Sequence, residues 1–167
     1  MTPADEALRA VTCCFTGHRL LAPEEREEAI LLLDQAIASA WAAGYQRFYS
    51  GAALGIDTLA AQRVLLFQAR HPEAELLLAV PCGNQSEKWP PEARRTHRRL
   101  CYGATEVRTL ARAYYPGCMQ VRNRYMVDRS SLCIAYLRTL RGGTLSTVRY
   151  ALSQEVRVIN LLVEGEV

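Results

Sequence analysis

The sequence predicts an α/β fold, namely a three-layer, Rossmann-like domain with a mostly parallel sheet of about five to six strands. Two observations carry this prediction. Short apolar runs alternate along the chain with longer segments of helical periodicity, and no internal repeat or low-complexity linker interrupts them. Several of the apolar runs are continuous, which is typical of parallel strands that helices cover on both faces.

Length and composition fit one domain over residues 1–167, with a core from about 10 to 163. The chain has 167 residues, 50% of them hydrophobic, which suffices for one sizeable core but argues against two domains. Its formal net charge of +3 is too small to indicate a nucleic-acid-binding protein by itself.

The cysteines and the apolar runs indicate a cytoplasmic protein. Its six cysteines form no CxxC pair, so we expect reduced thiols and no metal site. No apolar run approaches the roughly 18 residues of a membrane span, and the first residues do not resemble a signal peptide. We therefore expect no membrane partner.

Six apolar runs have the length and composition of strands. They span residues 10–15, 47–49, 75–80, 106–110, 132–137 and 156–163. The run at 75–80 is continuously apolar after its first residue and is stopped by Pro81, as expected for a strand buried on both faces. The run at 106–110 alternates and is the weakest candidate. The chain is thus predicted to begin with a strand.

Five segments between these runs have the periodicity of helices. They begin near residues 23, 59, 92, 119 and 145. The first starts at Pro23 with acids in its first turn and ends at Gly44. The third carries four arginines within 94–99, which usually form a solvated face; the alternative is a phosphate-reading surface. Thr144 is placed to cap the last helix.

Three loops rich in Gly, Ser and Thr follow the first, second and fifth predicted strands. They are Thr16–Arg19, Ser50–Asp57 and Arg141–Thr144. Because ligands bind beyond the carboxyl ends of parallel strands, we expect the loops to share one crevice. Glycines let the backbone approach a ligand, and the first amides of a helix attract a phosphate or carboxylate. The alternative is that Gly51 and Gly55 only permit a tight turn, and the G-x-G-x-x-G fingerprint is absent.

Side chains in and near these loops are candidates for ligand contact. Arg19 either faces an anion or pairs with Glu24 or Glu25. His18 either donates a proton or hydrogen bond or is structural. Asp57 is either a first-turn acid stabilised by the helix dipole or a ligand of a ribose hydroxyl.

The helix before the fifth strand adds further candidates. Asn123 and Arg124 can reach the crevice, and Arg124 and Asp128 are spaced for a surface ion pair. No Ser-His-Asp order, metal-ligand spacing or carboxylate pair stands out, so the sequence does not indicate catalysis; Asp57 and Asp128 are only weak catalytic candidates. The expected ligand-binding residues are Gly17, His18, Arg19, Ser50, Gly51, Gly55, Asp57, Asn123, Arg124, Gly142, Gly143 and Thr144.

Five motifs, in this order, resemble the SLOG superfamily, and within it the small stand-alone proteins of the YspA/YpsA type. They lie at Phe15–Arg19, Ser50–Asp57, Gln85–Trp89, Arg122–Asp128 and Gly142–Thr144. The resemblance covers about residues 11–163. It implies a Rossmann-like domain that binds a nucleotide or a nucleotide-derived molecule through its phosphate and acts as a sensor or processing module.

Two groups within the superfamily imply different functions. Residues 50–57 and 122–124 are similar to DNA-processing protein A, which implies single-stranded DNA as a partner; the arginines at 94–99, with Trp89 or Tyr114, then supply charge and stacking. The Gly142–Gly143 loop is similar to that of the cytokinin-activating phosphoribohydrolases, which use a glutamate shortly after a Gly-Thr pair. No glutamate occurs here before Glu155, so an N-glycosidic hydrolase needs Asp57 or Asp128 instead. Exposed strands at a sheet edge also favour a homo-oligomer.

Overall fold

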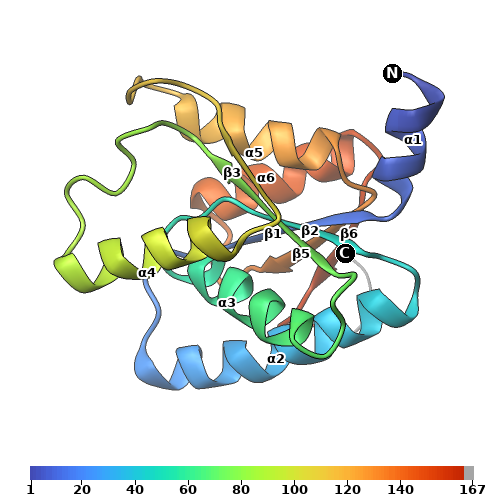
Figure 1. Cartoon of the computed structure of the whole chain (residues 1–167), viewed down its shortest axis with the longest axis horizontal. Helices are drawn as coiled ribbons and strands as arrows, with labels where there is room; N and C mark the ends of the chain where they lie inside the picture. Colours follow the sequence, from blue (N-terminus) through green and yellow to red (C-terminus); the bar gives the residue numbers. More distant parts are fainter. Residues whose placement is uncertain (164–167) are drawn as a thin grey trace.

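A six-stranded parallel sheet forms the centre of the computed structural model, which describes residues 1–163 (Figure 1). Its strand order is β4-β3-β2-β1-β5-β6, and every neighbouring pair is parallel. The strands are β1 (Thr12–Gly17), β2 (Arg47–Ser50), β3 (Glu75–Val80), β4 (Glu106–Thr109), β5 (Leu132–Tyr136) and β6 (Arg157–Asn160). The predicted α/β fold is confirmed. Residues 164–167 of the predicted domain lie outside the described part.

Helices cover both faces of the sheet. They are α1 (Pro3–Ala10), α2 (Pro23–Ala42), α3 (Ile56–Gln68), α4 (Pro91–Gly103), α5 (Cys118–Asp128) and α6 (Gly142–Ser153). Helices α2, α3 and α4 lie on one face, and α5 and α6 on the other (Figure 1). Alternate strand residues face the two layers: Phe15, Phe48 and Leu76 pack toward α2 and α3, whereas Cys14, Leu77 and Cys133 pack toward α5 and α6.

The chain begins with a helix, so the prediction that it begins with a strand at residue 10 is wrong. Thr2 and Asp5 form a capping box: Asp5 N donates to Thr2 Oγ1 (3.1 Å), and Thr2 N donates to Asp5 Oδ2 (2.9 Å). None of the residues of α1 is buried, so the helix has no core stripe like that of α2. The cap residues and Pro3 were the available signal.

The last helix and the last strand also differ from the prediction. Helix α6 begins at Gly142, three residues early, where φ is 87°, a left-handed value that favours glycine. Thr144 is the third residue of the helix and is buried, so it does not cap the helix. Strand β6 ends at Asn160, whose amide bonds both the N–H (3.2 Å) and the C=O (3.0 Å) of Leu137.

The order of the strands reverses beside β1. The chain adds β2, β3 and β4 on one side of β1 and then crosses to β5 on the other. At the carboxyl ends Gly17 pairs with Tyr136, so the switch point lies between the loops that follow these two residues. Within residues 1–163, no helix is both long and apolar enough to cross a membrane.

Candidate functional site

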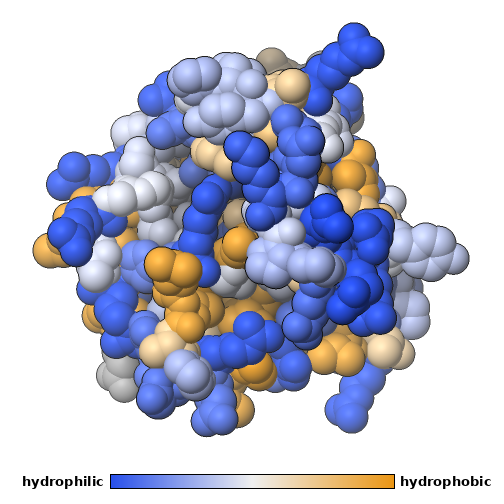
Figure 2. Space-filling view, turned by 90° about the vertical axis from the view of Figure 1, so that its left-hand side faces the viewer, coloured by the Kyte–Doolittle hydropathy of each residue, from blue (hydrophilic) through white to orange (hydrophobic). Residues whose placement is uncertain are grey.

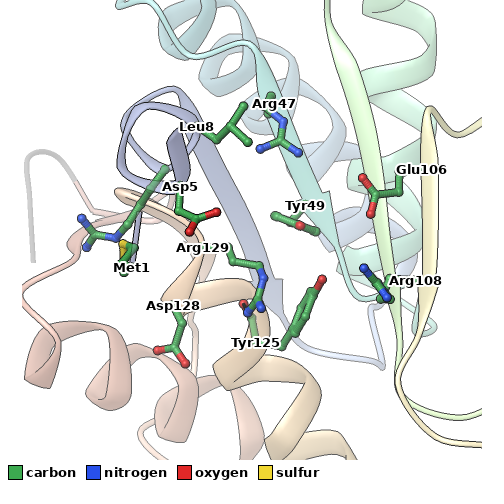
Figure 3. A pocket seen from close by; sticks show the side chains of 11 residues that line it. Met1, Asp5, Leu8, Arg47, Tyr49, Glu106, Arg108, Tyr125, Asp128 and Arg129 are labelled. Atoms are coloured by element: carbon green, nitrogen blue, oxygen red, sulfur yellow. Dashed lines mark hydrogen bonds between the residues drawn. The ribbon is translucent and has the colours of Figure 1, made fainter. Parts of the chain in front are cut away.

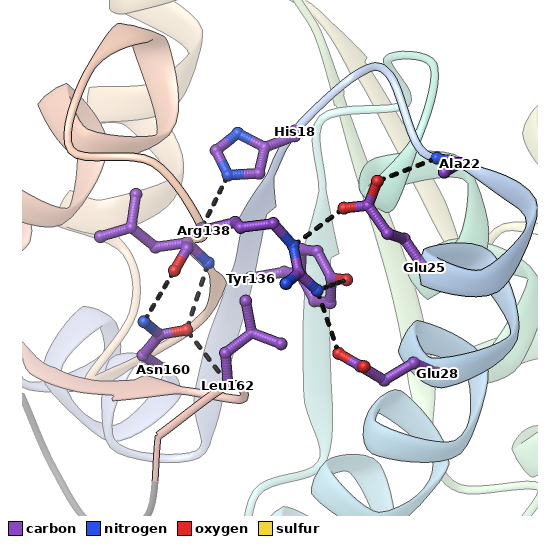
Figure 4. Close-up of polar contacts among 9 residues, drawn as sticks. His18, Ala22, Glu25, Glu28, Tyr136, Arg138, Asn160 and Leu162 are labelled. Atoms are coloured by element: carbon purple, nitrogen blue, oxygen red, sulfur yellow. Dashed lines mark hydrogen bonds and ion pairs between the residues drawn. The ribbon is translucent and has the colours of Figure 1, made fainter.

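His18 connects the loops that follow β1, β2 and β5. Its carbonyl oxygen accepts a hydrogen bond from the N–H of Ile56 (3.1 Å), the first residue of α3. Its ring Nε2 accepts one from the N–H of Arg138 (2.8 Å), just after β5 (Figure 4). The neutral ring must therefore carry its proton on Nδ1. Three segments that are distant in the sequence meet at this one residue.

Two glycines let the first two loops interlock. A Cβ on Gly17 would lie 2.5 Å from the Cβ of Ile56, and a Cβ on Gly55 would overlap the carbonyl oxygen of His18 and lie 2.6 Å from the Cα of Arg19. Gly55 also has a φ of 78°. In these two positions the missing side chain makes room for the neighbouring loop. Gly142 and Gly143 differ, because a Cβ there would meet nothing within 4 Å.

Gly51 packs against two buried ionisable side chains, Arg122 and Asp57. Arg122 on α5 is 3% exposed, and Asp57 on α3 is 7% exposed. Arg122 Nη1 donates to the carbonyl oxygens of Gly51 and of Ala79 (3.4 Å), and its Nε donates to Asn123 Oδ1 (2.7 Å). Burial raises the pKa of Asp57, and the charge of Arg122 opposes that shift. Burial likewise lowers the pKa of Arg122, and the charge of Asp57 raises it.

Arg122 is the residue at this edge that sequence reasoning missed. It appeared only within a motif of the family resemblance. A signal was present, because the buried residues of α5 include Cys118, Arg122 and Met126, spaced by four. An arginine in the apolar stripe of a helix must find buried acceptors, and here they are two backbone carbonyls.

Hydrogen bonds inside the loop after β2 hold it in shape. The hydroxyl of Ser50, which is fully buried, donates to the carbonyl of Asp57 (2.8 Å) and accepts from the N–H of Ala52 (3.1 Å). Ala52 has a φ of 56°, uncommon for a residue with a side chain. Thr58 Oγ1 donates to Ala53 O (2.7 Å). The Ser50 hydroxyl therefore stabilises the loop through hydrogen bonds within it.

Arg138, which the sequence analysis did not single out, forms the ion pairs with the acids of α2 that were considered for Arg19. Arg19 is exposed and donates to Met119 Sδ (3.6 Å), so the expected alternative of a pair with Glu24 or Glu25 is wrong. Arg138 instead pairs with Glu25 (2.9 Å) and Glu28 (3.2 Å) and donates to the hydroxyl of Tyr136 (2.8 Å; Figure 4). Arg19 is left at the carboxyl edge of the sheet.

The pKa of His18 reflects its partly buried position. Burial lowers it, the charge of Glu25 raises it, and the charge of Arg138 lowers it. A lowered pKa keeps the ring neutral, which suits its role as an acceptor for the N–H of Arg138.

Two predicted site residues, Arg124 and Asp128, lie away from the loop cluster, whereas Asn123 adjoins it through Nε of Arg122. Asn123 and Arg124 line a cavity of about 270 Å³ between α5 and α6. The predicted ion pair between Arg124 and Asp128 is wrong: Asp128 accepts from the hydroxyl of Tyr150 (2.7 Å), and the guanidinium of Arg124 lies 4.9 Å from the centre of the same ring. Asp128 ends α5 near the start of β1, where Ser131 N bonds Thr12 O (3.0 Å), at the opposite edge of the sheet.

The carboxyl edge of the sheet is hydrophilic. Figure 2 looks onto this side, where charged and polar side chains predominate, with apolar patches between them. The six cysteines are free thiols, five of them buried. Over the described residues, no three His, Cys, Asp or Glu side chains gather in a way that would hold a metal ion.

The all-parallel sheet, its switch point beside β1 and the glycine loop that Arg122 holds define a Rossmann-like α/β domain of the SLOG type. The model of the YspA SLOG family matches residues 24–156, and the chain belongs to this family. The family accounts for the order of the motifs along the chain.

Two curated relatives match parts of the chain, and the first is described as uncharacterised. YoqJ, a protein derived from the SPbeta prophage of Bacillus subtilis strain 168, is 27% identical over 117 residues, which are 63% of this chain and 68% of YoqJ. A UPF0398 protein of Halalkalibacterium halodurans is 27% identical over 89 residues, 52% of this chain and 47% of its own. The chain thus spans about half of the second relative.

Among solved structures, two DNA processing proteins A share the fold. The Helicobacter pylori protein, described as binding single-stranded DNA, superposes with a TM-score of 0.64 at 17% identity, over 94% of this chain and 67% of its own. The Streptococcus pneumoniae protein gives a TM-score of 0.63 at 17% identity, over 92% of this chain and 50% of its own.

Proposed function

We propose that the protein binds a nucleotide or nucleotide-derived ligand, through its phosphate, at the loops joined by His18. The observation that carries the proposal is that His18 bonds both Ile56 and Arg138 at the switch point of the sheet. Exposed Arg19 follows directly in the sequence. The ligand would let the protein act as a sensor or processing module.

The charges at this edge suit an anion. Helices α3 and α6 begin here, and the amino ends of helices attract negative charge. Gly142 and Gly143 present open backbone at the start of α6. Arg19 adds a guanidinium, which forms no ion pair with a carboxylate of residues 1–163.

The positions of Asp57 and Asp128 favour a binding function over hydrolysis. Asp57 is buried behind Gly51, and Asp128 lies at the opposite edge of the sheet. An acid or a water-orienting base must reach the substrate or one intervening water. Neither carboxylate is placed to do this beside the open glycines of α6.

Thermal-shift measurements test the proposal. Nucleoside mono- and diphosphates and ADP-ribose should raise Tm, because a ligand at hundred-fold excess over its Kd stabilises the folded state by about 2.7 kcal/mol. R19A should lose the shift. R70A is the matched control, because Arg70 is exposed beyond the carboxyl end of α3, away from the loops. No shift with any compound, or an equal shift in R19A, overturns the proposal.

Single-stranded nucleic acid is a second candidate ligand, and one helix face favours it. Arg95, Arg98, Arg99 and Tyr102 line a shallow hollow of about 360 Å³ on α4, and Tyr102 is 95% exposed. Exposed aromatic rings and arginines bind single strands by stacking and charge. Trp89, by contrast, packs edge-on against His97 at 5.4 Å. The structural relative from Helicobacter pylori, which is described as binding single-stranded DNA, supports this candidate.

Fluorescence anisotropy with a labelled oligonucleotide distinguishes this candidate from the first. Affinity should fall steeply between 50 and 200 mM salt as counterion release predicts. Y102A and R98A should weaken binding, whereas R19A should not. Binding that ignores salt, or that is unchanged in Y102A and R98A, excludes α4 as the interface.

A further inference from the structure

Strand β4 is an edge strand that no helix of residues 1–163 covers. It pairs with β3 alone, and all four of its residues are exposed. Its register with β3 places Glu106 beside Leu77 and Arg108 beside Ala79, which face α5 and α6. Glu106 and Arg108 therefore lie on that face, where both border a cavity of about 480 Å³ (Figure 3).

The open edge of β4 carries unused backbone groups. Leu110 N donates to Val80 O (2.9 Å), and because the bonding groups alternate along a strand, Glu106 and Arg108 direct theirs toward β3 as well. Val107 and Thr109 then direct N–H and C=O outward. Natural proteins protect such an edge from unwanted pairing or use it for a partner.

The charges of β4 are also unpaired in the single chain. Among the ion pairs within residues 1–163, none includes Glu106 or Arg108. The two side chains share a face and are separated by one residue, so a strand added at the edge would place residues opposite both of them. A strand with one acid and one base in this arrangement is complementary to its own copy in antiparallel orientation.

We propose that the protein forms a two-fold dimer in which β4 pairs antiparallel with β4 of a second copy, centred on Val107. This centre puts Val107 opposite itself, so that its outward N–H and C=O exchange two hydrogen bonds across the axis. It also puts each Glu106 opposite the Arg108 of the other copy. Those positions are non-hydrogen-bonded pairs, with Cα atoms about 4.5 Å apart, where side chains approach closest.

Charge selects this register over its neighbours. In an antiparallel pair, two residues that face each other direct their backbone N–H and C=O either both toward the partner strand or both away from it. The centre of a symmetric β4 pair can therefore move only from one residue to the next. A centre on Arg108 sets two arginines against each other, and a centre on Glu106 sets two glutamates, both of which are destabilising. Self-complementarity also favours a second copy over an unrelated strand, because the symmetry requires no other sequence.

Charge exchange at β4 tests the proposal by sedimentation equilibrium. The wild-type protein should be a dimer. E106R places two Arg–Arg contacts at the axis and R108E two Glu–Glu contacts, so each should raise the dimer Kd tenfold or more. The double variant E106R/R108E should restore the wild-type Kd, and a mixture of the two single variants should form a heterodimer. Both substituted positions are exposed, and circular dichroism checks that each variant is folded.

Two outcomes overturn the proposal. One is a wild-type chain that stays monomeric at 100 μM. The other is a dimer whose Kd does not change in E106R and R108E, which assigns the interface to another surface. R70E, which changes an exposed arginine away from β4, is the control and should leave the Kd unchanged.

Disulfide trapping tests the register independently. In V107C the two Cα atoms would lie about 5.5 Å apart, within the range that a disulfide spans. In the matched variant T109C the two cysteines would be offset by four residues, about 13 Å along the strand. Mild oxidation should give a covalent dimer with V107C and not with T109C or the wild type. The reverse result rejects the centre on Val107. Neither test depends on the ligand site.

Discussion

The guanidinium of Arg122 donates a hydrogen bond to the carbonyl oxygen of Gly51, which precedes it by 71 positions. The same nitrogen reaches the carbonyl of Ala79 near the end of β3 (3.4 Å). One buried side chain on α5 thus holds the carboxyl ends of β2 and β3. Because hydrogen bonds from a charged donor are stronger than neutral ones, we expect this edge of the sheet to be rigid.

Substitution of Gly51 by alanine should destabilise the protein. The added Cβ would overlap Nη1 of Arg122 and lie 2.6 Å from its Cζ and 2.7 Å from Oδ2 of Asp57. Neither side chain has room to move, because both are buried. Overpacking of this kind costs about 1–3 kcal/mol, which urea denaturation of G51A measures.

G143A is the matched control for that substitution. Gly143 lies in α6, and a Cβ there would meet nothing within 4 Å. Alanine in place of a helical glycine should stabilise by about 0.5–1 kcal/mol. Equal losses in the two variants would contradict the packing that we describe at Gly51.

Removal of the Arg122 charge should destabilise the protein far more than removal of a neighbouring exposed charge. R122M deprives the carbonyls of Gly51 and Ala79 of their buried donor and removes the charge that favours ionised Asp57; each buried acceptor left unsatisfied costs about 1–3 kcal/mol. R124M removes an exposed guanidinium from the same helix and loses a contact with Tyr150 worth about 0.5–1 kcal/mol. Urea denaturation compares the two, and similar values would show that Arg122 is not a structural centre.

Asp57 should make the protein less stable as the pH rises. Burial raises its pKa in the folded protein above the ordinary 3.8, so the folded state binds this proton more tightly than the unfolded state. The unfolding free energy therefore falls as the pH rises from 3.8 through the raised value and then levels. D57N lacks this dependence, so its stability relative to the wild type should grow as the pH rises from 3.8 through the raised pKa. A difference that shrinks would mean that Arg122 favours the charged form.

The sequence predicted the layers well because burial leaves a local pattern. Runs such as Glu75–Val80 are buried on both faces, and their boundaries could be read to within a few residues. Helix α1 was missed for the opposite reason: it buries no residue, and only its cap marks it. Strand β6 was predicted too long because Leu161–Val163 continue its apolar run, although Asn160 turns the chain toward Leu137.

The candidate site was less predictable, because its contacts are tertiary. The sequence does not show whether a glycine is open to a ligand or packed against a neighbouring loop. Gly143 has open space around it, whereas Gly55 packs against His18. Arg124 and Asp128 have the spacing of an ion pair, yet Tyr150 on another helix contacts both. Nothing local to α5 specifies that third residue.

His18 should make the connection between the loops sensitive to acid. Its Nε2 accepts from Arg138 N (2.8 Å), which only an unprotonated nitrogen does. Because burial lowers the pKa of the folded ring below 6.5, the stability it contributes is complete above pH 6.5 and is lost as the pH falls through the lowered value. In H18Q the amide oxygen accepts from the same N–H without titrating. The free-energy difference between wild type and H18Q should therefore shift against the wild type on acidification, by about 1 kcal/mol, the size of one such hydrogen bond. Urea titrations at several pH values measure it, and a constant difference would mean that the ring is not the acceptor.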